Sequence, residues 1–162
     1  MPKRTHKNGK GILFGNSGEY FVMAELLRRG INAALITRNA PEYDILATSD
    51  NSAVKIRVKT KTEPHDTWQW NAKKDGTLFH NVDDSDFSIL VHLPEIEAMP
   101  RYYIMPTERL DLKIKEKRVD WLSKPGRDGK PHDPNKRHRT ISEKNDSAFL
   151  EPFNNAWHIL GL

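Results

Sequence analysis

A strict alternation of apolar and basic side chains over residues 54–61 constrains the fold of this chain more than any other feature of its sequence. Its apolar positions are Val54, Ile56 and Val58, and its basic positions are Lys55, Arg57, Lys59 and Lys61. Because successive side chains of a β-strand point to opposite faces, this period of two predicts a strand with one apolar and one basic face. The chain must therefore build a sheet that buries the apolar face.

Other apolar runs predict the elements around this strand. A helix is expected over 15–30, with Asn16 or Ser17 as its cap and Gly30 as its terminator. Further strands are expected at 33–37, 43–48, 86–93 and 101–105, and further helices from the capping residue Thr107 to 121 and over 147–160, the last interrupted or started at Pro152. One helix, mostly consecutive strands and a helical C-terminus predict an α/β fold.

The length of 162 residues suits one hydrophobic core and hardly two, so we expect a single domain over 13–162. Residues 1–12 are expected to form a flexible basic tail. A polar basic loop is expected at about 124–140, where prolines and glycines interrupt the charged residues. Asp75 and Gly76 stand between two aromatic stretches and predict a hairpin over 67–80.

Several function classes are disfavoured by what the sequence lacks. There is no cysteine, which removes thiol catalysis and cysteine-based metal sites. The seven histidines show no zinc-binding spacing, and no glycine-rich phosphate loop is present, so nucleotide hydrolysis is disfavoured. No apolar run approaches the roughly 20 residues of a membrane-spanning helix, and the basic N-terminus leads into no signal-peptide core. The expectation is a cytoplasmic protein without a membrane partner.

The distribution of charge says more than the formal net charge of +4. Residues 113–139 contain ten Lys or Arg residues against four acidic ones, an excess of six. Such segregation suits a surface that faces a polyanion, although a charge run is also typical of a solvated loop. The residues expected to contact nucleic acid are Lys61, Lys117, Arg118, Arg127, Lys130, Lys136, Arg137 and Arg139.

Three residues could carry metal-dependent phosphodiester cleavage. This chemistry needs hard oxygen ligands for Mg²⁺ and a cation beside the scissile phosphate. Asp44 lies in one predicted strand and Lys59 in the next, with a single turn between the two strands. Glu19, in the preceding helix, can add a ligand or position water. Each has an ordinary alternative role, because strand lysines are often solvent-exposed and an acid in a helix's first turn is often a favourable charge.

The motifs that carry these residues resemble the PD-(D/E)XK nuclease-like superfamily. They are Gly15-x-x-Gly18-Glu19, Tyr43-Asp44-Ile45-Leu46 and the strand that ends in Val58-Lys59-Thr60. This resemblance implies the restriction-endonuclease-like fold, a central mixed β-sheet flanked by helices. It implies a Mg²⁺-dependent DNA endonuclease with Glu19, Asp44 and Lys59 as its catalytic residues. It also implies that metal is held by Asp44 and Glu19. The backbone carbonyl of Val58 could add a ligand, as backbone carbonyls do elsewhere.

Arg57 stands where this superfamily carries Asp, Glu or Gln, and an arginine cannot bind Mg²⁺. A guanidinium on the same face as Lys59 could pair with Asp44 in place of the metal, which predicts weak metal affinity. Glu63 could replace the missing acid if the strand continues, although Pro64 follows directly. The alternatives are therefore a catalytically inactive nuclease-fold module that binds nucleic acid, or a protein-interaction module such as a symmetric homodimer.

Overall fold

The computed structural model describes residues 4–36 and 42–162, with side chains from Lys10 onward. A five-stranded sheet in the order β1-β2-β3-β5-β6 forms its centre. The strands of this sheet are β1 (Asn32–Leu35), β2 (Ile45–Thr48), β3 (Ala53–Thr62), β5 (Asp86–Leu93) and β6 (Arg101–Pro106). β3 pairs with β5 in parallel, and the other pairings are antiparallel, so the sheet is mixed as predicted.

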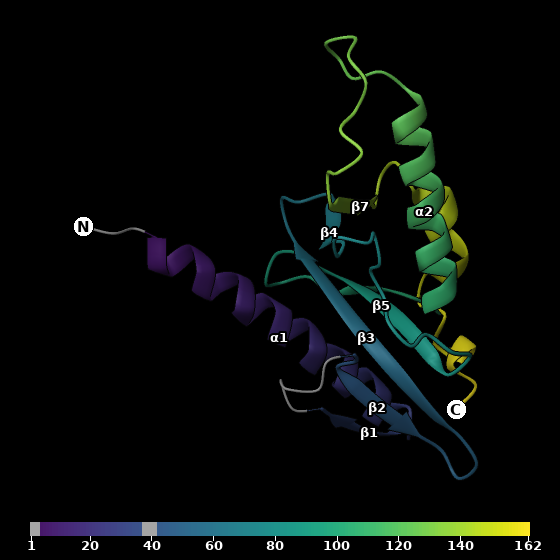
Figure 1. Cartoon of the computed structure of the whole chain (residues 1–162). Coiled ribbons are helices and arrows are strands. Elements are labelled where there is room, and N and C mark those ends of the chain that lie inside the picture. The colour runs from purple at the N-terminus through teal and green to yellow at the C-terminus, as the bar shows by residue number, and fades with distance from the viewer. Residues whose placement is uncertain (1–3, 37–41) are drawn as a thin grey trace.

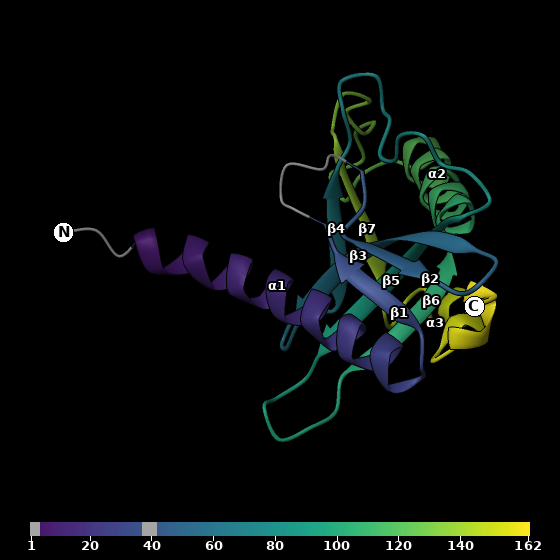
Figure 2. The same ribbon diagram turned by 90° about the horizontal axis from the view of Figure 1, so that it is seen from below.

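Side chains that alternate along β3 and β5 divide the apolar core into two clusters, one on each face of the sheet. Ile56 of β3 and Ile89 of β5 face α1 (Arg4–Arg28) in the larger apolar cluster. Leu90, the next residue of β5, faces the other way and packs in a second cluster with α2 (Thr107–Ser123). Figure 2 shows α1 and α2 on opposite sides of the sheet. A central mixed sheet flanked by helices is the α/β architecture expected from the sequence.

The first helix differs from its prediction at the N-terminal end. It begins at Arg4, so most of the segment expected as a flexible tail is helical, and residues 1–3 lie outside the described residues. Helix propensity is a weak prior, and the expected cap residues Asn16 and Ser17 lie inside α1 instead of before it. Gly30 follows the helix with a φ of +78°, the left-handed conformation expected of its terminator. Figure 1 shows the N-terminal half of α1 extending away from the sheet.

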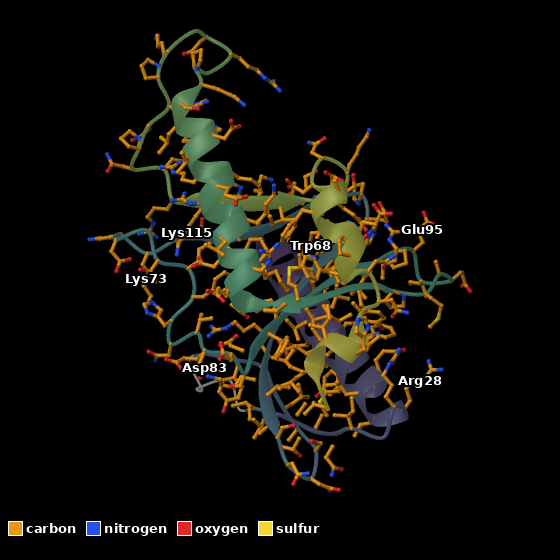
Figure 3. The ribbon with its side chains drawn as sticks, turned by 90° about the vertical axis from the view of Figure 1, so that its right-hand side faces the viewer. Arg28, Trp68, Lys73, Asp83, Glu95 and Lys115 are labelled. Atoms are coloured by element: carbon orange, nitrogen blue, oxygen red, sulfur yellow. The ribbon has the colours of Figure 1, made fainter. Side chains whose placement is uncertain are left out.

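The predicted hairpin over 67–80 contains one strand, not two. β4 (Thr67–Asn71) pairs with β7 (His138–Ser142), far away in the sequence, and the two form a small antiparallel sheet. A turn does occur at Gly76, whose N–H donates to the carbonyl of Lys73, but residues 77–79 form no strand. Trp68 of β4 is buried in the second cluster, so its ring packs on the core and is not exposed for stacking on nucleic-acid bases. In Figure 3 Trp68 lies in the interior and Lys73 at the periphery.

The C-terminal half follows the predictions with three differences. α2 begins at Thr107, but Pro106 occupies the capping position and the Thr107 hydroxyl bonds to Asp86 and Ser88 instead of capping the helix. No helix or strand occurs between α2 and β7, and β7 begins at His138, inside the range expected for the polar loop. The predicted terminal helix is divided into α3 (Ser147–Leu150) and two 3₁₀ turns (Glu151–Phe153 and Trp157–Leu160). Within residues 4–36 and 42–162 no helix is both long and apolar enough to cross a membrane.

Candidate functional site

Asp44 lies directly before β2, at the point beyond which β3 is no longer paired with β2. Its backbone N–H donates to the carbonyl of Ile56 (2.9 Å), and its own carbonyl accepts from Ile36 (2.8 Å). Ile45 pairs with Ile56, so the later residues of β3 extend beyond the reach of β2. The Asp44 carboxylate accepts the N–H of Val58 through Oδ2 at 2.7 Å. The side chain thus satisfies a strand N–H that no residue of β2 reaches, and this holds the carboxylate against β3.

Asp44 and Lys59 form a partly desolvated pair of opposite charges. Burial raises the pKa of the Asp44 carboxyl, an effect only partly offset by the hydrogen bond from Val58 and the charges of Arg57 and Lys59. Burial likewise lowers the pKa of the Lys59 ammonium, and the charge of Asp44 opposes this change. Both shifts move the two groups toward their neutral forms. Groups with shifts of this origin are concentrated at functional sites.

Arg57 does not pair with Asp44, contrary to the pairing considered from the sequence. Its guanidinium turns toward β5, donating from Nε to Asp86 Oδ1 (2.9 Å) and from Nη2 to Asp86 Oδ2 (2.7 Å). A third bond reaches the carbonyl of His80 at 2.8 Å. The physical reason is the register of β3 with β5, which sets Asp86 opposite Lys55, two residues from Arg57 on the same face. Arg57 therefore leaves the Asp44 carboxylate unobstructed by a direct bond.

Glu19 approaches Lys59 from the helix side. The two residues line an open cavity of about 700 Å³, and Val58, Thr60 and Trp70 line it as well. The ammonium of Lys59 lies 5.7 Å from the centre of the Trp70 ring. Asp44 does not line this cavity; it reaches the same part of β3 through its bond to Val58. The three predicted catalytic residues are thus gathered around residues 58–60, Glu19 on the cavity side and Asp44 on the β2 side.

The position of Glu19 depends on the close approach of α1 to β3. A methyl group on Gly18 would lie 3.0 Å from Cβ of Thr60 and would overlap the Thr60 hydroxyl. That hydroxyl is buried and, among the described residues, has no hydrogen-bond partner. Helix and strand backbones can come this close only because residue 18 has no side chain. Glycine in the middle of a helix costs about 1 kcal/mol, which is offset here by the contact that it permits.

Two sequence-derived candidates are held by other partners, although Lys61 also lines the cavity of Glu19 and Lys59. Lys61 is buried, and its ammonium bonds to Glu143 (2.6 Å), so it offers no charge to a ligand at the surface. Glu63 lies 2.8 Å from His92 and therefore does not take the place of the missing metal ligand. Asp86, the partner of Arg57, was not singled out from the sequence. Its signal was an acid at the start of an otherwise apolar strand, where a buried carboxylate needs a partner.

A magnesium site can be tested against these donors. Within the described part of the chain no three His, Cys, Asp or Glu side chains cluster as metal ligands. Mg²⁺, however, usually binds one or two carboxylates and completes its shell with water and substrate phosphate. Asp44 has one oxygen outside its bond to Val58, and the carbonyl of Val58 points to the same edge of β3 as its N–H. Asp44, Glu19 and that carbonyl are oxygen donors of the kind that such a partial site uses.

The basic residues of the C-terminal half fall into two sets. Arg127, Lys130 and Arg137 are exposed on the loop between α2 and β7. The others gather around a cavity of about 160 Å³ between α2 and β7, and they are Lys117, Arg118, Lys136 and Arg139. The sequence placed all of them in one basic stretch, but it could not separate those that line a cavity from those that do not. Trp121 and His138 line the same cavity and were not predicted.

No family model matches this chain, and no curated protein matches it. Among solved structures, a bacterial homing endonuclease, I-Ssp6803I, shares 18% identity and a TM-score of 0.49, covering 92% of this chain and 90% of the endonuclease. A Holliday junction resolvase from the archaeal hyperthermophile Archaeoglobus fulgidus shares 14% identity and a TM-score of 0.43, covering 80% of this chain and 84% of the resolvase. Both likenesses span most of either chain and concern the fold alone.

Proposed function

We propose that this chain is a metal-dependent endonuclease that hydrolyses phosphodiester bonds in DNA, with Glu19, Asp44 and Lys59 as its catalytic residues. The observation that carries the proposal is the pair of Asp44 and Lys59, both of which are partly desolvated. The N–H of Val58 holds Asp44, and Arg57 makes no direct bond to Asp44 because it binds Asp86. An ordinary surface ion pair would have no such shifts in pKa. Charged groups whose pKa values are shifted by burial are typical of sites that act on a ligand.

In this proposal Asp44, Glu19 and the Val58 carbonyl hold Mg²⁺ at the edge of β3. When bound, the ion stabilises negative charge on the phosphate and makes a coordinated water more acidic. Lys59 places its ammonium beside the phosphate oxygens and offsets the charge that develops as water attacks phosphorus. Asp44 keeps its orientation throughout, because the N–H of Val58 anchors one of its oxygens. Weak metal affinity is expected, because Arg57 and Lys59 bring two positive charges close to Asp44.

The first prediction compares two lysines on the same face of β3. Lys59→Ala removes the cation beside the proposed phosphate, and we expect cleavage of plasmid or branched DNA in Mg²⁺ or Mn²⁺ to fall by about 10²–10³-fold. Lys55→Ala is the matched control, because Lys55 binds Asp83 at the outer end of the strand and lies outside the cavity. We expect it to retain cleavage. Absence of cleavage by the unmodified chain across metals and substrates would refute the proposed function.

A second candidate function is supported by a specific observation. Arg57 replaces a metal-binding side chain, and no three-ligand cluster occurs among the described residues. Both features would suit a catalytically inactive module that binds nucleic acid or, in a homodimer, another copy of the chain. Such a module predicts DNA affinity that falls with salt and is indifferent to Mg²⁺ or EDTA. The endonuclease instead predicts metal-dependent product, which gel electrophoresis detects directly.

A further inference from the structure

A second basic centre lies outside the proposed catalytic site, between the C-terminal half of α2 and the strand β7. Its cavity of about 160 Å³ is lined mainly by positively charged or polar side chains around Trp121, with Ile114 as an apolar member. The lining residues are Ile114, Lys117, Arg118, Trp121, Lys136, His138, Arg139 and Thr140. None of these is acidic. Figure 1 shows that the segment between α2 and β7 returns alongside the helix, which brings both walls of the cavity together.

Aromatic and hydrogen-bonding contacts hold these cations in place. His132 stacks on Trp121 with ring centres 3.8 Å apart and an angle of 11° between the planes, which fastens the loop to α2. Arg118 lies over the same indole at 4.6 Å and donates from Nη2 to the carbonyl of Pro134 at 2.6 Å. Lys136 lies over this indole too, at 5.6 Å. The side chains of Arg118 and Lys136 are therefore already restricted, and they lose less conformational entropy when they bind a ligand.

The cations converge without acidic partners sufficient to balance them. Lys117 pairs with Asp146, but Arg139 bonds only to backbone carbonyls, those of Lys136 and His138, among the described residues. Burial lowers the pKa of the Arg139 guanidinium, and the charge of Arg118 lowers it further. Like charges therefore repel one another across the cavity. Each guanidinium has five N–H donors, so both arginines retain donors beyond the bonds that position them.

We propose that this cavity binds a backbone phosphate of a polynucleotide. An oxyanion with several acceptor oxygens relieves the repulsion between Arg118 and Arg139, and it suits the forked donors of two guanidiniums. The size of the cavity admits one such group. The ligand class is taken from the proposed function, on which this inference rests, but binding at the cavity needs neither metal nor cleavage.

The cavity also indicates the path of the nucleic acid. His138, the first residue of β7, lines both this cavity and the cavity that contains Glu19 and Lys59. The two therefore meet at the small sheet of β4 and β7. A polynucleotide with one phosphate beside Lys59 can cross this sheet and place another phosphate between α2 and β7. The substrate is thus a chain of several nucleotides, held at two separate phosphates.

The test measures binding of a fluorescently labelled 20-base-pair duplex in EDTA, by anisotropy over a range of salt concentrations. The double variant Lys136→Gln/Arg139→Gln removes two charges from the cavity. We expect its dissociation constant to rise by on the order of tenfold, and the slope of log affinity against log salt to decrease by about 1 for each phosphate that the variant no longer neutralises. The control Lys73→Gln/Lys74→Gln removes the same charge from an exposed turn that lines neither cavity. It should bind nearly as the unmodified chain does.

Equal weakening by the two double variants would mean diffuse attraction and overturn the inference, as would normal binding by the cavity variant. Arg139→Lys keeps the charge but not the forked donors, and an intermediate loss is expected, which guards against a general loss of fold. Lys55→Ala, at a residue outside both cavities, should bind the duplex normally. If the cavity variant loses binding while no variant cleaves DNA, the proposed function fails and the phosphate site stands. If Lys59→Ala loses cleavage while the cavity variant binds normally, the site fails and the function stands.

Discussion

Arg57 and Asp86 form a pair whose role is structural at the scale of single residues. The Asp86 side chain is completely buried, and its Oδ1 also accepts the hydroxyl of Thr107 at 2.6 Å. Removal of the guanidinium would leave this carboxylate buried without its counter-charge, which typically costs about 3–5 kcal/mol. Arg57 is therefore tied to the packing of β3 on β5 and α2. Its presence where a metal ligand was expected does not require that it block Asp44.

Asp44 belongs to the same scale and gives a prediction about stability. Its folded-state pKa is raised above the ordinary value of 3.8, so in the folded chain the ionised carboxylate is less favourable than in the unfolded one. The cost is absent below pH 3.8 and develops as the pH rises through the folded-state pKa. We expect Asp44→Asn to be more stable than the unmodified chain at pH 7, by about 1 kcal/mol, and to lose cleavage. Thermal unfolding across the pH range measures the difference.

The sign of this difference is the critical result. The amide oxygen of Asn can still accept the N–H of Val58, so the variant keeps the bond that orients residue 44. The two proteins should therefore converge in stability near pH 3.5. An Asn variant that is less stable at pH 7 than at pH 3.5, relative to the unmodified chain, would contradict a burial cost at this carboxylate.

At the scale of elements, the contact between α1 and β3 decides the geometry of the candidate site. Gly18 meets Thr60, whereas a Cβ added to Gly15 would have no atom within 4 Å. Both glycines lie inside α1, one turn apart. They share a helical environment and differ in what they touch. The sequence showed both glycines but not which of them faces the sheet.

This pair supplies a matched test. Gly18→Ala should destabilise the chain by about 1–3 kcal/mol, because overpacking forces α1 away from β3 and shifts Glu19 with it. Gly15→Ala should be neutral or stabilising by up to about 1 kcal/mol, since alanine favours the helix and meets nothing there. Denaturant unfolding with matched slopes compares the two variants. Equal effects would show that the helix does not approach the strand as closely as described.

At the scale of the whole molecule, Glu143 connects the two sheets. It lies just after β7 and bonds to Lys61 of β3 (2.6 Å) and Tyr103 of β6 (2.9 Å). Burial raises the pKa of its carboxyl, but these bonds and the charges of Lys61 and His92 outweigh burial and lower the pKa to about 2. The same network raises the pKa of Tyr103 to about 12, first through burial and then through Glu143. Glu143 therefore holds the small sheet, and with it both cavities, against the central sheet.

A depressed pKa means that this contribution to stability is present above the ordinary value of 4.5 and is lost as the pH falls toward 2. Glu143→Gln leaves the buried Lys61 ammonium without its carboxylate, so we expect a loss of about 3 kcal/mol at pH 7. The variant should also show a shallower decline in stability between pH 4.5 and pH 2. Glu116→Gln, at an exposed position of α2, is the control and should leave the acid limb unchanged. Parallel acid limbs for Glu143→Gln and the unmodified chain would refute the assignment.

The sequence by itself determined the elements and faces that depend on local periodicity. Alternation in β3, the apolar run of β5 and the glycine after α1 were sufficient to predict two central strands and the end of the first helix. The same periodicity placed Asp44 and Lys59 on neighbouring strands. These features follow from neighbours along the chain, which side-chain period and turn chemistry reveal.

Only the tertiary structure decided which partner each charged residue finds. Arg57 binds Asp86 because β3 and β5 pair in one particular parallel register. Lys61 is paired with Glu143, which lies far along the sequence from β3, and the basic stretch divides into cavity and exposed residues because β7 pairs with β4. Each of these interactions joins distant segments, and no local pattern encodes their register. The sequence therefore identified the residues of the candidate site, and long-range pairing determined which charges remain available to a ligand.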